Sequence, residues 1–391
     1  MKFQVDEQFL LNCFQEFVAA PSPVAYSEQL LPLLERYAAR FGHTVTYDRR
    51  GTAYITMDGE DNSKTVLLAA HCDTLGLMVR SIDSDGKLRV RQLGGVNYNN
   101  LEGETVTVHT RDGREYTGMI TCQSHSVHVF EDARTLERTE KTMVILLDED
   151  VRSEADVRAL GIRHGDYVFI DSRCELTQNG YLKSRFIDDK AAVACVFTML
   201  KYLQEQGQKP KYRTMIAFTF GEEIGMGGPY VPAEVSEYIA VDIGLIGPDY
   251  DGHERNVAIC AKDKKAPYSY ELTNRLIAYA EKADCDYAVD VFFNYSTDAT
   301  AAVMCCNDLQ VGAFGMPVYC SHGRERTHIL SLKNTLNLML AYVLDILVSN
   351  SKGGATAPPL FYSISQRSPQ YFSSALATAS AFSRLVPGYR P

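Results

Sequence analysis

Two adjacent glutamates, Glu222 and Glu223, end the apolar run "YRTMIAFTF" at residues 212–220. Taken alone, such a pair is most simply a solvated pair at the end of a strand. Two carboxylates this close repel each other unless a positive group lies between them. The pair therefore raises the question of what positive group the fold would place there.

Acceptor side chains follow other apolar runs of the chain in the same way. Each is weak evidence by itself, because a lone histidine is usually structural and an Asp-Asp pair before a helix usually caps it. In a parallel sheet, however, ligands collect where the carboxyl ends of the strands meet. The side chains at these predicted strand ends are His71, Asp73, Asp188, Asp189, Asp242 and His322, in addition to the two glutamates.

Imidazole and carboxylate groups together suit divalent Zn²⁺, Co²⁺ or Mn²⁺. Two such ions about 3.5–4 Å apart need a bridging carboxylate and lower the pKa of a shared water. A further carboxylate must then accept a proton without binding metal. Consecutive side chains at a strand end point in different directions, so one glutamate could bind metal while the other acts as the base. The pattern predicts a hydrolytic centre with two metal ions.

The elements that would position these groups alternate between apolar strands and amphipathic helices. This order predicts an α/β fold with a mainly parallel, helix-covered sheet. Nearly continuous apolar runs are typical of strands that are buried on both faces. Helices are predicted at 27–42 and 188–210, and core strands at 65–71, 214–220, 237–244 and 309–315.

Residues 80–175 differ in character, with short alternating runs separated by Asp-Gly and Gly turns. This pattern predicts a small inserted β-barrel or sandwich domain, which leaves residues 1–79 and 176–350 as one discontinuous catalytic domain. Residues 351–391 contain no Asp or Glu and are rich in Ser, Ala and Pro. We expect a disordered tail there and assign it no chemistry.

Composition narrows the range of partners and compartments. A net charge of −10 without a basic run argues against nucleic acid. No apolar stretch reaches the roughly 20 residues that cross a bilayer, and the N-terminus is not a signal peptide. Ten cysteines without a C-x-x-C spacing fit a reducing compartment, so we expect a cytoplasmic protein. Cys305, Cys306 and Cys320 are expected to be core thiols rather than nucleophiles.

An ordered set of motifs across about residues 5–345 resembles peptidase family M42, the dinuclear metallo-aminopeptidases related to the tetrahedral aminopeptidases. Members of this family carry a small β domain between the first His motif and the Asp-Asp motif, and they assemble through it. The resemblance therefore implies a homo-oligomer, from a dimer to a dodecamer, with an inserted dimerisation domain. The motifs are "AAHCDTLGLMV", "FIDDKAA", "GEEIGMGG", "AVDIG", "STDATAA" and "GMPVYCSHGRERTH".

The resemblance also implies site roles, including two divalent ions per subunit, with Zn²⁺ or Co²⁺ favoured and Mn²⁺ next. Glu222 would be the general base, and Asp189 would follow Asp188 through an unusual backbone geometry. The implied ligands are His71 and Asp242 for one ion, Glu223 and His322 for the other, and Asp188 bridging both, with Asp73 orienting His71. The chain departs from the family at Thr74, Lys190 and "GRER", which border the site.

The expected function is removal of N-terminal residues from short peptides. A related carboxypeptidase or N-deacylase would use the same metal chemistry, and a catalytically silent scaffold would keep the fold without turnover.

Several other polar residues are weaker candidates. His125 and His128 are expected on a strand, in structural or surface roles or at the rim of the site. His328 is a weaker ligand than His322. Thr297 and Asp298 could border the substrate pocket or cap the following helix, and both readings stay open.

Overall fold

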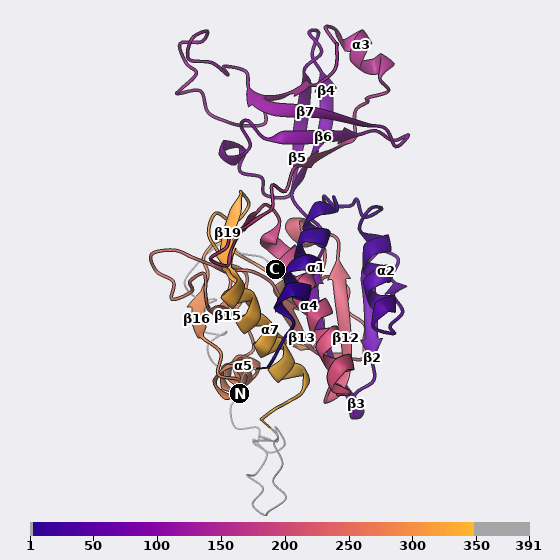
Figure 1. Cartoon of the computed structure of the whole chain (residues 1–391), viewed down its shortest axis with the longest axis vertical. Helices are drawn as coiled ribbons and strands as arrows, with labels where there is room; N and C mark the ends of the chain where they lie inside the picture. Colours follow the sequence, from indigo (N-terminus) through magenta and orange to yellow (C-terminus); the bar gives the residue numbers. More distant parts are fainter. Residues whose placement is uncertain (1–2, 348–391) are drawn as a thin grey trace, which may run out of the picture. The chain divides into compact units, whose positions relative to one another are not determined.

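The computed structural model describes residues 3–347, so the tail predicted at 351–391 lies outside the described residues. An eight-stranded sheet has the strand order β1-β2-β12-β3-β13-β17-β15-β16 (Figure 1). Its strands are β1 Thr46–Tyr47, β2 Ala53–Met57, β3 Asp61–His71, β12 Tyr212–Thr219, β13 Val235–Val241, β15 Val257–Lys262, β16 Tyr287–Val291 and β17 Gln310–Gly315.

The sheet is mainly parallel, as predicted. Strands β12, β3, β13 and β17 run parallel to one another, and the antiparallel pairs are β1 with β2, β2 with β12, and β15 with β17. Strand β3 is buried on both faces: Val66 and Leu68 belong to one hydrophobic cluster, and Leu67 and Ala69 to another. Burial on both faces is why its sequence is continuously apolar.

Helices cover the sheet, most of them on one face. Residues of α1, α2, α4, α5 and α7 share a cluster with Val66 and Leu68, whereas α6 contributes to the opposite cluster. Helix α2 begins later than the predicted 27–42, because Pro32 occupies its first turn and lacks the N–H that a helix interior needs. The helices are α1 Glu7–Ala19, α2 Leu31–Arg40, α4 Ile187–Gln206, α5 Tyr270–Lys282, α6 Asp298–Met304 and α7 Ile329–Val343.

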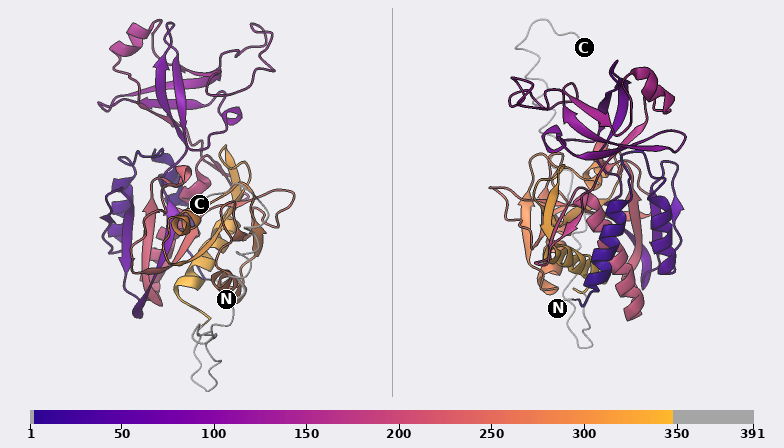
Figure 2. Two further views of the ribbon diagram at one scale, coloured as in Figure 1. Left: turned by 180° about the vertical axis from the view of Figure 1, so that it is seen from behind. Right: turned by 45° about the horizontal axis from the view of Figure 1, so that its top comes forward.

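The inserted segment forms a closed antiparallel barrel in the order β4-β5-β8-β7-β6-β9, drawn in purple in Figures 1 and 2. Its core is a hydrophobic cluster separate from the two on the sheet. Strand β4 already begins at Gly76, close after His71 at the end of β3. The barrel elements are β4 Gly76–Ile82, β5 Leu88–Leu93, β6 Thr105–His109, β7 Glu115–Cys122, β8 Met143–Leu147, β9 Tyr167–Ile170 and the helix α3 Glu154–Ala159.

Short elements connect the barrel and the sheet to the candidate site. Strand β11 leads into α4, and β19 follows His322 and pairs with β11. These elements are β10 Glu175–Leu176, β11 Tyr181–Ser184, β14 Gly244–Leu245, β18 Pro317–Val318, β19 Glu325–His328 and the 3₁₀ turns η1 Tyr98–Asn100 and η2 Glu222–Ile224. Within residues 3–347, none of the helices is both long and apolar enough to cross a membrane.

Two local expectations were wrong. Cys305, Cys306 and Cys320 are exposed rather than core thiols, because α6 ends before the first two and Cys320 lies in a surface loop. His125 and His128 lie in a turn after β7, not on a strand, and the ring of His125 packs edge-on against Phe130. An apolar local pattern does not reveal where a helix or a strand stops.

Candidate active site

The carboxyl ends of neighbouring strands bring the predicted acceptors together. His71 is the last residue of β3 and lies opposite Thr219, the last residue of β12. The 3₁₀ turn η2, which carries Glu222 and Glu223, follows β12 at once. Asp242 comes directly after β13, the other neighbour of β3. Parallel pairing therefore places groups from three separate parts of the chain at one edge of the sheet.

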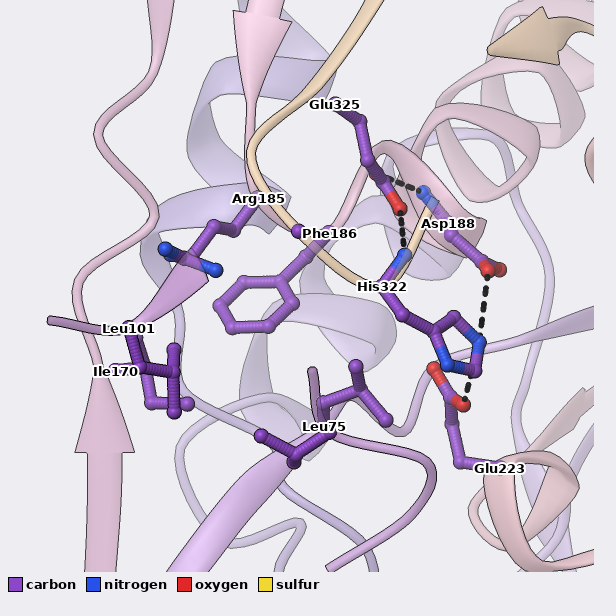
Figure 3. A pocket seen from close by; sticks show the side chains of 11 residues that line it. Leu75, Leu101, Ile170, Arg185, Phe186, Asp188, Glu223, His322 and Glu325 are labelled. Atoms are coloured by element: carbon purple, nitrogen blue, oxygen red, sulfur yellow. Dashed lines mark hydrogen bonds and ion pairs between the residues drawn. The ribbon is translucent and has the colours of Figure 1, made fainter. Parts of the chain in front are cut away.

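Asp188, at the start of α4, lies between the two histidines. Its Oδ1 is 2.8 Å from Nε2 of His71, and its Oδ2 is 3.9 Å from Nε2 of His322. Oε2 of Glu223 is 3.4 Å from the same nitrogen of His322 (Figure 3). The side chains of Asp188 and Glu223 are nearly buried, at 8% and 4% exposed. The arrangement gives His322 two carboxylate neighbours and gives Asp188 a histidine on each side.

Two sets of three residues have ligand atoms that all lie within 4.8 Å of one another: the first group is His71, Asp188 and Glu223, and the second is His71, Asp189 and Asp242. Oδ2 of Asp189 accepts a hydrogen bond from the backbone N–H of His71 at 3.1 Å. Its Oδ1 is buried and lacks a hydrogen-bond partner among the described residues. The peptide bond between Asp188 and Asp189 is cis, which is the unusual backbone geometry that the resemblance implied.

Glu222 faces the same space as these groups. Its Oε2 is 3.9 Å from Nε2 of His71. Together with Asp188, Glu223 and His322 it lines a cavity of about 480 Å³, whose other walls include Tyr295. A cavity of this size lies within the usual range of sites that bind small molecules.

The carboxylate of Asp73 lies at the glutamate pair rather than mainly at His71. It accepts hydrogen bonds from the backbone N–H groups of Glu222 at 3.0 Å and Glu223 at 3.2 Å. Nδ1 of His71 donates a hydrogen bond to the main-chain carbonyl of Asp73 at 2.9 Å. The carboxylate of Asp73 is 3.7 Å from the same nitrogen. Because a carbonyl can only accept, the Nδ1 of His71 carries a proton and its Nε2 points to Asp188.

Glu325 is a site residue that the sequence patterns did not single out. It is 2% exposed, and its two oxygens accept from the backbone N–H groups of Asp188 at 3.0 Å and His322 at 3.3 Å (Figure 3). His322 has a left-handed backbone, with φ of +60°, which a non-glycine residue seldom adopts. Glu325 thus fixes the backbone of two proposed ligands. The sequence signals for Glu325 were its position three residues after His322 and its place in the stretch "GRER", which was expected to border the site.

The electrostatics of the cluster favour bound cations. Burial, followed by repulsion from Asp242, raises the pKa of Glu222 well above its usual value. Burial and Asp188 raise the pKa of Glu223 well above its usual value and that of Asp242 to about 7. Several buried carboxylates, two imidazoles and an unpartnered carboxylate oxygen form a donor set that fits divalent Zn²⁺, Co²⁺ or Mn²⁺.

The buried carboxylates predict how cations change stability with pH. The pKa of Asp242 is 3.8 in the unfolded chain and about 7 in the folded protein. The folded state therefore binds this proton more tightly, and the resulting contribution to the free energy of unfolding is present at low pH and is lost as the pH rises toward 7. Cations relieve this loss, so saturating Zn²⁺ should raise Tm by at least about 5 °C at pH 7.5, and by less at pH 5. Thermal unfolding of metal-free and Zn²⁺-loaded protein at both pH values measures the difference. Equal gains at both pH values would contradict the prediction.

The weaker candidates lie in structural positions. His328 caps α7, with Nδ1 accepting from the N–H of Leu330, and Thr297 caps α6 by accepting from Ala299. The carboxylate of Asp298 accepts from the hydroxyl of Thr219 at 2.7 Å and keeps one buried oxygen without a partner among the described residues. His125 and His128 are not part of either candidate metal group in the described chain.

Comparisons with known proteins show the family of the chain and its fold relatives. The family model "M42 glutamyl aminopeptidase" matches residues 51–338. The chain is 38% identical over 339 residues to the candidate aminopeptidase YhfE of Bacillus subtilis (strain 168), covering 86% of this chain and 98% of that protein.

Two solved structures share the fold. One is the TET1 peptidase of Pyrococcus horikoshii, which is described as able to assemble into a tetrahedron or a large octahedral shell. It is 23% identical to this chain with a TM-score of 0.76, and the match covers 86% of this chain and 99% of that chain. The aminopeptidase APDkam598 of Desulfurococcus kamchatkensis has a TM-score of 0.78, 22% identity and coverage of 87% and 95%. From the extent of the family match, the chain belongs to the M42 glutamyl aminopeptidase family.

Proposed function

We propose that this chain is a metal-dependent aminopeptidase that removes N-terminal residues from short peptides through a water activated by two divalent ions. The observation that carries the proposal is the convergence of His71, Asp188, Glu223 and His322 beside a substrate-sized cavity that Glu222 also lines. Family membership supports peptide-bond hydrolysis.

The proposed ligand sets are those that the family resemblance implies, and the contacts support them. His71 and Asp242 would hold one ion and Glu223 and His322 the other, with Asp188 between them. Asp189 lies in the second group, with His71 and Asp242, and is a further candidate ligand for the ion that those two residues would hold. When bound, two such ions polarise the scissile carbonyl and lower the pKa of a water.

Glu222 then moves the protons. Glu222 borders the cavity. The carboxylate of Asp73 accepts hydrogen bonds from the backbone N–H groups of Glu222 and Glu223, which fixes the backbone from which both side chains extend. In this role the Glu222 carboxylate accepts a proton from the attacking water and returns it to the leaving amine. Asp73 and Glu325 are positioning residues, since they contact the backbone of site residues rather than the cavity.

The cavity favours a free amino terminus over a free carboxylate. Lys and Arg do not occur among the residues that line it, whereas Asp188, Glu222, Glu223 and Asp242 do. Because Asp188, Glu223 and Asp242 are proposed metal ligands, Glu222 is the lining acid left to attract an ammonium group, and a substrate carboxylate has no Lys or Arg partner among the lining residues. The lining therefore supports an aminopeptidase over a carboxypeptidase.

A substrate panel tests the proposal. Protein loaded with Zn²⁺, Co²⁺ or Mn²⁺ should hydrolyse aminoacyl-p-nitroanilides and reject their N-acetyl forms by at least about 100-fold, because an acetylated amine cannot bind as a free amino group and leaves its polar partners in the cavity unpaired. A chelator should abolish the activity, and added metal should restore it. Preferential cleavage of N-acyl substrates, or of N-blocked peptides at their carboxyl end, would instead identify an N-deacylase or a carboxypeptidase. Elemental analysis that finds no metal after supplementation would favour a silent scaffold.

We further propose that the chain forms a homo-oligomer in the cytoplasm, with residues 80–175 as the dimerisation domain and residues 1–79 and 176–350 as the catalytic domain. Support comes from the closed barrel within the insert and from structural neighbours described as a dodecamer and as tetrahedral or octahedral shells.

A further inference from the structure

A loop of the inserted barrel reaches the candidate site. Residues 94–97 follow β5 and lead into η1, and Asn97 lines the same cavity as Glu222. Nδ1 of His322 lies 2.8 Å from the main-chain carbonyl oxygen of Gly95. His322 itself comes from the other end of the chain, between β18 and β19. The barrel segment is therefore part of the surroundings of a proposed metal ligand.

The contact with Gly95 determines which ring nitrogen of His322 is free. A carbonyl oxygen only accepts hydrogen bonds, so Nδ1 must carry the proton that it donates. In a neutral imidazole the other nitrogen, Nε2, then carries the lone pair, and here it points to Glu223 at 3.4 Å and Asp188 at 3.9 Å. A hydrogen bond of this kind to the far nitrogen fixes both the tautomer and the ring orientation of a metal-binding histidine.

Two glycines make the close approach possible. A Cβ on Gly94 would lie 2.5 Å from Leu75 Cδ2 and 3.2 Å from the Cβ of Glu223, and the φ of +79° at Gly94 also disfavours other residues. A Cβ on Gly95 would lie 3.0 Å from Nδ1 and 3.2 Å from Cε1 of His322, with no other contact within 4 Å. The loop backbone thus packs directly against two proposed ligands of the same ion.

The same barrel segment is also anchored to the chain that leads to Asp188. The guanidinium of Arg185, which is 3% exposed, donates to the carbonyl of Asn100 and lies 3.3 Å from the carboxylate of Glu104. Phe186 and Ile187 alone separate Arg185 from Asp188. The side chain of Asn100 packs against Gly323, where a Cβ would lie 2.4 Å from its Nδ2. Residues 94–104 are therefore held against two segments of the site, the one that carries His322 and the one that leads to Asp188.

We propose that the inserted barrel completes the metal centre of its own chain, with the Gly95 carbonyl as the positioning group that holds His322 in its metal-binding tautomer. The inference rests on the proposed two-metal function and assigns the insert a role in the site that is separate from assembly. It predicts that disturbing the Gly95–His322 contact lowers the affinity for the ion held by His322 and Glu223 more than the affinity for the ion held by His71 and Asp242.

The test is Gly95→Ala in the full chain. The added methyl group meets only the ring of His322, and we expect the affinity for one of two Co²⁺ or Zn²⁺ ions to fall about 10- to 100-fold, as when an outer hydrogen-bond partner of a ligand is lost. Isothermal titration of the metal-free protein measures affinity and stoichiometry, and the absorption spectrum of bound Co²⁺ reports the altered site. Gly247→Ala is the matched control, because its Cβ meets the ring of Tyr250 at 3.2 Å instead.

Two ions bound by Gly95→Ala with wild-type affinities would overturn the inference. Failure of the wild-type chain to bind transition metal would instead contradict the proposed function, so the two failures are distinguishable. A second measurement does not depend on the folding of a variant: nitrogen NMR of histidine-labelled, Zn²⁺-loaded wild-type protein should show His322 protonated at Nδ1. An Nε2–H form of His322 would equally overturn the inference.

Discussion

Glu222→Gln should lower kcat at least about 100-fold while both metal ions stay bound, since general-base catalysis typically contributes 10²- to 10⁴-fold. Glutamine has nearly the shape of glutamate but cannot take a proton from the attacking water. The proposed ligand set does not include Glu222, whose Oε2 lies 3.9 Å from Nε2 of His71, so its charge is not expected to be needed for metal binding. The measurement is steady-state kinetics on an aminoacyl-p-nitroanilide together with metal content per chain.

The neighbouring residue supplies the matched comparison. Glu223→Gln removes a carboxylate that lies 3.4 Å from His322, so it should lose metal as well as activity. Glu234→Gln, at an exposed position, should change neither. A wild-type kcat in Glu222→Gln would remove that residue from the role of base. Loss of metal in Glu222→Gln and retention in Glu223→Gln would exchange the two assignments.

The convergence of the site could be predicted because it follows from sheet topology. Apolar runs buried on both faces indicate parallel strands, and parallel strands end at a common edge. The register of β3 against β12 places His71 opposite Thr219, three residues before Glu222. The strand order and the positions of the strand ends are therefore enough to predict that the two glutamates lie beside the histidine.

The contacts that orient the ligands could not be predicted from sequence. They depend on backbone carbonyls and amides, whose positions are unrelated to residue type. The carbonyl of Asp73 and that of Gly95 orient the two histidines, and neither appears as a pattern in the chain. Glu325 is separated from Asp188 by 137 residues, and only the pairing of β11 with β19 brings the two together.

Asp188→Asn should remove more activity than any other single change, by at least about 10³-fold. The Asp188 carboxylate has His71 at 2.8 Å on one oxygen and His322 at 3.9 Å from the other, so it is the one proposed ligand that serves both ions. Lewis-acid stabilisation by bound metal contributes several kcal/mol, and about 4 kcal/mol corresponds to this factor. Asparagine keeps the shape of the side chain while removing the negative charge between two cations.

The expected result is fewer than two ions per chain after dialysis, along with the lost rate, whereas Glu222→Gln keeps its metal. Asp290→Asn is the control of matched chemistry and burial, because Asp290 is 5% exposed and its carboxylate accepts from the amides of Asp251 and Gly252. It should retain metal and kcat. Two tightly bound ions in Asp188→Asn would contradict the bridging role, because a neutral amide cannot offset the repulsion between neighbouring divalent cations as a carboxylate does.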